Sequence, residues 1–287
     1  MIQLGDIQIA LVTDGVMHVD AGGAFGLTPR PLYRPYFEPD AHNLIPMALH
    51  CLVVRAAGKT VVVDTGLGLK LTERQRRNWG VVRDSGNLID WLARLGVRPE
   101  SVDLVINTHL HADHAAGDTK FGVDEHDIVP TFPNAEYVVQ RREYEDAVHP
   151  NERTAASYLP INYQPLVESG RMRLLDGDTE ILPGIHGVIT RGHTPAHMSI
   201  RFESQGQHAL FVADMASYAV HFEKLGWMTA YDVEPLQTLE TKRRWQQWAL
   251  DTGALLIFQH DPTRRAGRLV QDGDRRVLEV VELAYGD

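Results

Sequence analysis

The sequence predicts an α/β protein in which two β-sheets pack against each other and helices cover the outside. Two observations support this class: short apolar runs typical of strands occur in both halves of the chain, and amphipathic helices occur beside them. No tandem repeat, low-complexity tract or Gly/Ser linker divides the sequence. We therefore expect one domain over residues 1–287.

The expected strands are apolar runs bounded by turn residues. Val61–Asp64 ends at Thr65-Gly66, and Val102–Asn107 leads directly into Thr108-His109. The other expected strands are Ile7–Val12, Leu49–Val54, Glu136–Gln140, Met198–Phe202, Ala209–Ala213, Leu255–Phe258 and Val277–Leu283.

Two segments have the apolar spacing of helices. Over Asn87–Leu95, leucine and isoleucine side chains recur on one helical face, and Gly96 follows as a stop signal. Glu234–Leu250 is the second helix, and Gly253 ends it. These helices are expected to cover the outer faces of the sheets.

Long irregular segments separate some of these elements, and residues 22–47 form the first, an N-terminal arm or lid. Irregular segments of this length are usually binding loops or contact arms. Their aromatic side chains are expected either to line a substrate pocket or to fasten the loops to the body or to a dimer partner. The pocket candidates are Phe25, Tyr33, Tyr36, Phe37, Phe222 and Trp227.

The composition is that of a folded globular protein of 287 residues, 44% hydrophobic and 23% charged. It excludes a collagen-like or wholly disordered chain, and Cys51 as the single cysteine excludes a disulfide scaffold. The 28 basic and 38 acidic side chains give a net charge of −10, which argues against nucleic acid as a partner. Without a secretory leader or an apolar window of transmembrane length, a cytoplasmic protein that does not enter membranes is expected.

The densest group of chemically active side chains lies in Thr108–His114, directly after an expected strand. His109 and His111 alternate, so an extended backbone points both to one side, and Asp113 and His114 follow after a bend. Imidazole and carboxylate groups together suit zinc and other first-row divalent ions. Surface histidines near a helix start would explain one or two of these residues, but not all four.

Three later residues, His193, Asp214 and His260, each follow an apolar run typical of a strand. Side chains at strand ends are held rigidly by the sheet. Because one short loop cannot complete two coordination spheres, these three residues are candidates for the remaining ligands.

With these residues the sequence resembles the metallo-β-lactamase fold hydrolases, which carry H-x-H-x-D-H followed by a distant His, Asp and His. The likeness covers most of the chain, and Val62–Gly66 is similar to the family's early strand that ends in aspartate. The resemblance implies a four-layer αββα sandwich of two mixed β-sheets with outer helices. It places the site at one edge, between the sheets.

The resemblance also implies two divalent metal ions per chain. Zinc is the expected metal, and iron, manganese and cobalt are the alternatives. The implied ligands form two sets joined by one aspartate: His109, His111 and His193; Asp113, His114 and His260; and Asp214, which would bridge both ions together with a water or hydroxide. Asp64 would orient a ligand histidine through its free ring nitrogen.

The activity that the resemblance implies is hydrolysis of an ester by the hydroxide between the two ions. An acidic residue at Asp214 disfavours a β-lactamase, and His111 in place of glutamate disfavours a flavin-linked diiron oxygen reductase. The strand-like run Val277–Leu283 stands where thioester hydrolases of the glyoxalase II type carry a helical part. The lactonase branch remains.

We therefore predict a metal-dependent hydrolase that opens lactones of the N-acyl-homoserine type or related esters, as quorum-quenching enzymes do. An organophosphate or aryl-ester/phosphoester hydrolase of the same fold is the main alternative. A thioester hydrolase and a metal-binding protein without turnover are further alternatives. The expected partner is a small ester or lactone substrate, and neither nucleic acid nor a membrane is expected as a partner. A homodimer is an open alternative to a monomer.

Two side chains are candidates for catalysis beside the ions. Asp113 would carry a proton once its contact with a metal loosens. Quorum-quenching lactonases carry a tyrosine three residues after the bridging aspartate, whereas Ser217 holds that position here and Tyr218 follows it. Tyr218 is therefore expected either to assist the carbonyl oxygen or to be structural.

Overall fold

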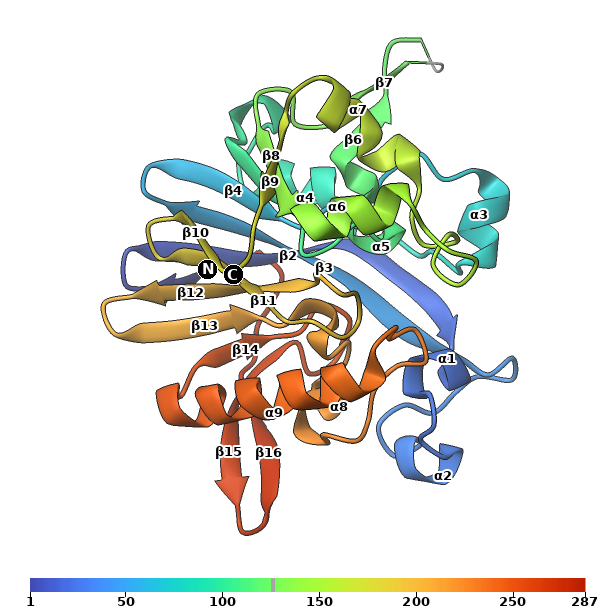
Figure 1. Cartoon of the computed structure of the whole chain (residues 1–287), viewed down its shortest axis with the longest axis vertical. Coiled ribbons are helices and arrows are strands. Elements are labelled where there is room, and N and C mark those ends of the chain that lie inside the picture. Colours follow the sequence, from blue (N-terminus) through green and yellow to red (C-terminus); the bar gives the residue numbers. More distant parts are fainter. Residues whose placement is uncertain (125–126, 287) are drawn as a thin grey trace.

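Two seven-stranded β-sheets face each other in the computed structural model, which describes residues 1–124 and 127–286 (Figure 1). The first sheet comprises, in spatial order, β1 (Ile2–Leu4), β2 (Ile7–Asp20), β3 (Leu44–Ala56), β4 (Lys59–Val63), β5 (Leu104–Ile106), β8 (Glu136–Gln140) and β9 (Met172–Leu175). The second comprises β10 (Thr179–Leu182), β11 (Ile185–Ile189), β12 (Met198–Ser204), β13 (Gln207–Phe211), β14 (Leu255–Ile257), β15 (Ala266–Asp272) and β16 (Arg275–Val280). β6 (Thr119–Phe121) and β7 (Ile128–Pro130) form a separate ribbon.

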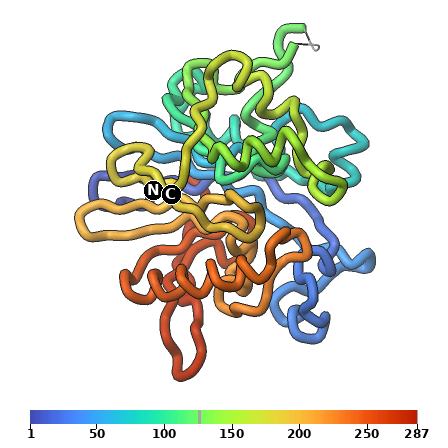
Figure 2. The backbone as a smooth tube through the Cα atoms, viewed as in Figure 1, coloured from blue at the N-terminus to red at the C-terminus, as the bar shows by residue number. Residues whose placement is uncertain are grey.

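The chain completes the first sheet before it enters the second. In Figure 2 the green segments of the chain lie in the upper part of the view, and the orange and red segments lie in the lower part. Short helices connect the strands, and one long helix lies near the C-terminus. The α-helices of the described residues are α1 (Ala21–Phe25), α2 (Arg30–Tyr33), α3 (Glu73–Asn78), α4 (Leu88–Arg94), α5 (Ala112–Ala115), α6 (Arg141–Val148), α7 (Gln164–Glu168), α8 (Ala219–Glu223) and α9 (Pro235–Thr252).

Helices cover the outer face of each sheet. Leu88 and Leu92 of α4 pack with Val62 and Val105 of the first sheet, and the two tryptophans of α9 pack on the second. The predicted four-layer arrangement, helices outside two mixed sheets, is therefore confirmed. Among the described residues no helix is long and apolar enough to cross a membrane.

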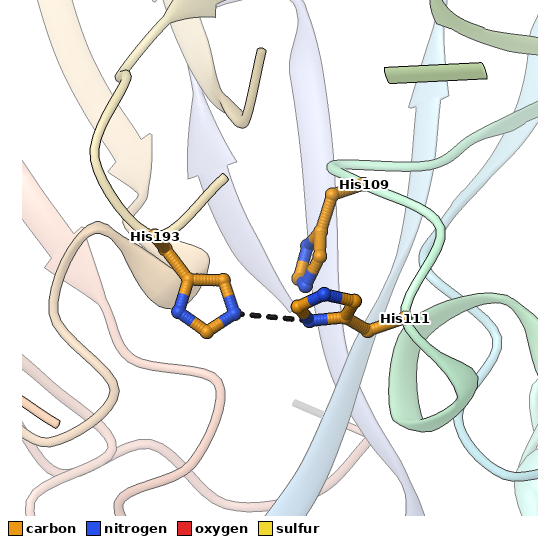
Figure 3. Close-up of side chains that lie close together, drawn as sticks. All are labelled: His109, His111 and His193. Carbon is orange, nitrogen blue, oxygen red and sulfur yellow. Dashed lines mark hydrogen bonds between the residues drawn. The ribbon is translucent and has the colours of Figure 1, made fainter. Parts of the chain in front are cut away.

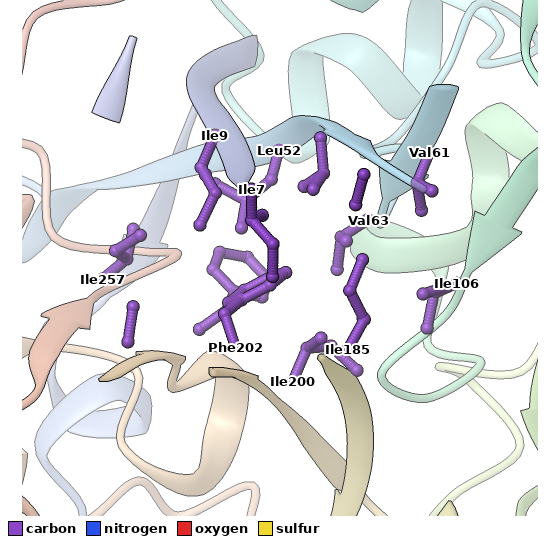
Figure 4. Close-up of a cluster of buried hydrophobic side chains, with 14 of the residues drawn as sticks. Ile7, Ile9, Leu52, Val61, Val63, Ile106, Ile185, Ile200, Phe202 and Ile257 are labelled. Atoms are coloured by element: carbon purple, nitrogen blue, oxygen red, sulfur yellow. The ribbon is translucent and has the colours of Figure 1, made fainter. Parts of the chain in front are cut away.

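The main hydrophobic core lies between the two sheets (Figure 4). Alternate residues of a strand point to opposite faces, so Ile7, Ile9 and Leu11 of β2 enter this core while Ala10 and Val12 face α4. The second sheet contributes its own row of apolar side chains to the same layer: Ile185, Ile200, Phe202, Phe211 and Ile257.

Each sheet contains parallel strands, and their ends determine where the site forms. β4, β5, β8 and β9 run parallel in the first sheet, and β13 and β14 run parallel in the second. Since the carboxyl ends of parallel strands meet at one edge, the segments that follow β4, β5, β13 and β14 can converge there.

The predicted helices are confirmed, and their ends follow the expected signals. Asn87 caps α4 by accepting hydrogen bonds from the backbone N–H groups of Ile89 and Asp90. Gly253, with φ of +62°, ends α9 in the left-handed conformation that glycine adopts at low cost.

The first half of the chain is more regular than the sequence predicts. β2 and β3 extend well beyond the apolar runs Ile7–Val12 and Leu49–Val54 because they pair along their whole length, with a register shift between Thr13 and Val16. The segment expected to be irregular contains α1 and α2. The oxygen of Asp20 that accepts hydrogen bonds from two glycine N–H groups starts α1.

Candidate metal centre

The residues predicted as ligands meet at the edge where strands of both sheets end. His109 and His111 follow β5, and Asp113 and His114 lie in α5. The second sheet supplies the other three: His193 follows β11, Asp214 follows β13, and His260 follows β14.

The first group consists of His109, His111 and His193, whose rings point toward one another (Figure 3). Their potential ligand atoms all lie within 4.8 Å of one another. Nε2 of His193 is 3.0 Å from Nδ1 of His111, and all three residues are buried. This group joins the first sheet to the second.

The second group consists of Asp113, His114 and His260. Nε2 of His260 lies 3.3 Å from Nε2 of His114, and Oδ2 of Asp113 lies 3.6 Å and 3.7 Å from these two nitrogens. The side chain of Asp113 is 18% exposed, whereas both histidine rings are fully buried. Asp113 is therefore the member of this group that solvent reaches.

Asp214 lies between the two groups. Its Oδ2 is 3.1 Å from Nε2 of His193, and its Oδ1 is 3.0 Å from Nε2 of His260. Ser217 donates a hydrogen bond to Oδ1, and the backbone N–H of Asp214 donates to Nε2 of His197. Ala213 has φ of +48°, a conformation that alanine rarely adopts, so the surrounding packing stabilises the turn that presents this carboxylate.

The geometry and chemistry of these side chains fit metal ions. Two ligand atoms held about 2.0–2.2 Å from one tetrahedral ion lie roughly 3.3–3.6 Å apart, close to the separations within both groups. Nε2 of His109 is buried without a hydrogen-bond partner among the described residues, which is unfavourable unless a ligand satisfies it. Nitrogen and carboxylate donors suit zinc and similar divalent ions.

Buried carboxylates contact two of the rings that are predicted to bind metal. Oδ2 of Asp64 lies 2.9 Å from Nδ1 of His114, and the same carboxylate accepts hydrogen bonds from the backbone N–H and hydroxyl of Thr108. Asp64 is thus placed beside the ring of His114. Asp232, which no sequence pattern indicates because it lies in an irregular segment, is 3.0 Å from Nδ1 of His193. Such partners fix ring orientation and tautomer.

The electrostatic environment shifts the pKa values of the histidines in different directions. Burial and the neighbouring histidines lower the pKa of His109 and of His111 well below the usual range, which keeps both rings neutral and able to bind a cation. Burial also acts against protonation of His114, but the carboxylates of Asp113 and Asp214 outweigh it and raise the pKa of this ring. Despite burial, the adjacent histidines hold the pKa of Asp214 well below its usual range.

A cavity of about 600 Å³ opens onto both groups. His111, Asp113, His193 and Asp214 line its inner end. One wall is apolar and comes from the long strands β2 and β3 and from the end of α3: Met17, Val19, Leu44, Met47 and Trp79. Polar groups, among them Arg153 and Tyr231, line other parts of the cavity. The cavity therefore suits a small molecule with both a polar and an apolar part.

None of the six aromatic side chains expected in the pocket lines this cavity. Phe25 stacks on Tyr33 and also contacts Phe37 and Trp227, so these rings fasten the N-terminal arm to the body. Tyr36 packs on Trp227 and is 41% exposed. Phe222 is buried in the core beneath α9. The aromatic composition of these loops reflects core packing, which one sequence does not distinguish from a pocket wall.

Tyr218 is also placed in this aromatic cluster. Its ring is fully buried between Phe25 and Phe37, and its hydroxyl lies 3.3 Å from the carbonyl oxygen of Pro46, to which it donates. Tyr218 is not among the residues that line the cavity. These contacts agree with the alternative that Tyr218 has a structural role. Asp113, the other candidate for catalysis, is among the residues that line the cavity.

Comparison with known proteins agrees with this geometry. A sequence model of the metallo-beta-lactamase superfamily matches residues 45–244. An N-acyl homoserine lactonase of Bacillus sp is 26% identical over 236 residues, 78% of this chain and 86% of the relative. The crystal structure of a probable metal-dependent hydrolase from Staphylococcus aureus is 31% identical, with a TM-score of 0.88 over 99% of this chain and 100% of the other. AidC, a dizinc quorum-quenching lactonase, has a TM-score of 0.79 at 20% identity over 99% of this chain and 97% of the other, which shows a shared fold.

Proposed function

The chain belongs to the metallo-beta-lactamase superfamily and is a metal-dependent hydrolase, and we propose that it opens lactones. We infer from its metal centre that it uses two divalent ions, with zinc as the preferred metal. The observation that carries this proposal is the position of Asp214. One carboxylate oxygen faces His193 and the other faces His260, so a single side chain reaches both ligand groups.

The residues that would hold the ions divide between the two groups. We assign the first ion to His109, His111 and His193, the second to Asp113, His114 and His260, and Asp214 to both. Two bound divalent ions lower the pKa of a water molecule and polarise a carbonyl oxygen, which is the chemistry that ester hydrolysis needs at neutral pH.

The protein contributes orientation and proton transfer. Asp64 and Asp232 each hold the far ring nitrogen of one ligand histidine, which fixes the nitrogen that faces the centre. The apolar wall of the cavity would accommodate an acyl chain, and the polar end would receive the ring ester. Asp113 lines the cavity and is partly exposed, so we assign to its carboxylate the transfer of a proton to the leaving oxygen.

Metal analysis combined with a substrate panel tests the proposal. We expect about two ions per chain, and lactone hydrolysis that chelation abolishes and added zinc restores. The panel includes aryl esters and phosphotriesters, which represent the main alternative function. A clear preference for phosphotriesters, or a metal-loaded protein without lactone turnover, would contradict the lactonase assignment.

A further inference from the structure

Glu143 is a buried carboxylate near the centre that the ligand set does not include. It lies in α6, and its side chain is fully buried, whereas the flanking Arg141 and Arg142 are exposed. Taking a carboxylate out of water is costly unless hydrogen bonds replace the lost solvation. Burial accordingly raises the pKa of Glu143. The desolvation cost of this buried carboxylate indicates that its hydrogen bonds have a specific role.

Three donors converge on this carboxylate. Oε1 accepts hydrogen bonds from the backbone N–H of Leu110 at 3.1 Å and from the hydroxyl of Tyr158 at 2.9 Å. Oε2 accepts from the hydroxyl of Thr194 at 2.6 Å. The two oxygens therefore bind different segments of the chain at once.

Each of these donors is adjacent to a proposed ligand of the first ion. Leu110 lies between His109 and His111, and Thr194 directly follows His193. Tyr158 pairs with His111 through an isolated β-bridge, and the N–H of Ala112 donates to the carbonyl of Ser157. The carboxylate of Glu143 thus joins the loop after β5 to the loop after β11, which belong to different sheets.

We propose that Glu143 is a positioning residue for the metal centre, because its carboxylate holds the His109–His111 loop and the His193 loop at a fixed separation. This inference rests on the proposed function in so far as these histidines bind metal. In the first ligand group, Asp232 already contacts the ring of His193, as Asp64 contacts the ring of His114 in the second, and Glu143 adds a support of a different kind. The hydrogen bonds of Glu143 go to the segments that carry the histidines and not to their rings, so it acts on the position of these segments.

Two substitutions of Glu143 separate hydrogen bonding from charge. Glu143→Ala removes all three hydrogen bonds. Glu143→Gln keeps them, since its amide oxygen can accept from Leu110 and Tyr158 while its amide nitrogen donates to a Thr194 hydroxyl that has turned. We expect Glu143→Ala to weaken zinc binding, measured by chelator competition, by about 10–100-fold, the usual cost of losing an outer partner of a ligand. Glu143→Gln should stay within about threefold of the wild type.

Hydrogen exchange of the metal-free protein gives a readout that does not depend on metal binding. The amide of Leu110 donates directly to Glu143, so its exchange should accelerate in Glu143→Ala and stay slow in Glu143→Gln. Failure of the wild type to bind zinc would contradict the proposed function, while this comparison would still test the link between the loops. Unchanged zinc affinity together with unchanged Leu110 exchange in Glu143→Ala would overturn the inference.

Single-bond variants provide the test if Glu143→Ala does not fold. Thr194→Val and Tyr158→Phe each remove one donor, and we expect each to weaken zinc binding several-fold. Tyr163→Phe is the matched control, because the hydroxyl of this buried tyrosine donates to the carbonyl of Ala147 in α6, the helix that also carries Glu143. Equal zinc affinities for Tyr158→Phe, Thr194→Val, Tyr163→Phe and the wild type would overturn the inference.

Discussion

Nε2 of His193 lies 3.0 Å from Nδ1 of His111, although 82 positions separate the two residues. One ring belongs to the loop after β5 in the first sheet, and the other to the loop after β11 in the second. Two neutral rings at this distance share at most one proton, whereas a cation can bind both nitrogens. The contact thus makes the centre depend on the packing of the two sheets.

The first prediction concerns this contact. We expect His193→Ala to reduce the metal content of the purified protein to about one ion or fewer per chain. Lactone turnover should fall by more than the roughly 10–100-fold that loss of an outer partner costs. His186→Ala serves as control, because His186 lies on β11 outside both ligand groups. Full metal content and full activity in His193→Ala would contradict the ligand assignment.

The second prediction concerns Asp64, which contacts His114. Its φ of +54° is a conformation that asparagine tolerates better than most residues, so Asp64→Asn preserves the backbone while it removes the charge. We expect zinc affinity to fall about 10–100-fold, measured by chelator competition. Asp103→Asn is the control, since its carboxylate accepts from Lys59 and Thr60 away from the centre. Equal affinities in the two variants would refute a role for Asp64 in ligand orientation.

The positions of the proposed metal ligands could be read from the sequence because local spacing indicates them. Thr108–His114 places four donor groups in one loop, and His193, Asp214 and His260 each follow a strand. A side chain that directly follows a strand is held rigidly by the sheet, so the end of an apolar run marks a position suited to a ligand. The two-sheet sandwich could be predicted because apolar runs, typical of strands buried on both faces, occur in both halves of the chain.

The supporting residues and the pocket could not be predicted, because tertiary contacts determine them. Glu143 stands in the charged run Arg141–Asp146, which is typical of a solvent-exposed helix, and nothing local shows that it is buried. The cavity wall comes from Met17 and Leu44, which lie on parts of β2 and β3 that the apolar pattern does not reach. The arm aromatics pack on one another and are not among the residues that line the cavity.

The third prediction compares the contributions of Tyr218 and Ser217 to catalysis. We expect Tyr218→Phe to keep kcat within about threefold of the wild type, because its hydroxyl donates to Pro46 inside the aromatic cluster. The loss of this hydrogen bond should cost about 0.5–1.5 kcal/mol of unfolding free energy. Ser217→Ala should reduce kcat more, since its hydroxyl donates to Asp214. A much larger kcat loss in Tyr218→Phe than in Ser217→Ala would assign catalysis to the tyrosine.

The fourth prediction tests the apolar wall of the cavity. Leu44→Ala removes methyl groups that line it, and a partly buried contact of this size contributes about 1 kcal/mol. We therefore expect kcat/KM for a long-chain acyl lactone to fall about fivefold, with little change for a short-chain one. Leu27→Ala is the control, because Leu27 is fully exposed and outside the cavity. An equal loss for both chain lengths would place the acyl chain elsewhere.

The fifth prediction concerns pH and the buried carboxyl of Asp118. Burial raises the pKa of Asp118 from 3.8 to about 8, although Thr65 and Asn107 donate hydrogen bonds to it. Between these values the folded protein holds a proton that the unfolded chain releases, so this group makes the folded state less stable as the pH rises. We expect the unfolding free energy of the wild type to fall by about 2–3 kcal/mol relative to Asp118→Asn between about pH 5 and pH 7.

Urea unfolding of the chelator-treated proteins at several pH values measures this difference, because the variant lacks only the titrating group. Asp103→Asn is the control: a hydrogen bond from the N–H of Thr60 and a contact with Lys59 lower the pKa of Asp103, so its contribution is lost only as the pH falls toward the acid range. The difference between Asp103→Asn and the wild type should therefore stay constant from about pH 5 to pH 7. A constant difference for Asp118→Asn as well would mean that Asp118 is ionised in the folded protein, its charge stabilised by the hydroxyl of Thr65 and the amide of Asn107.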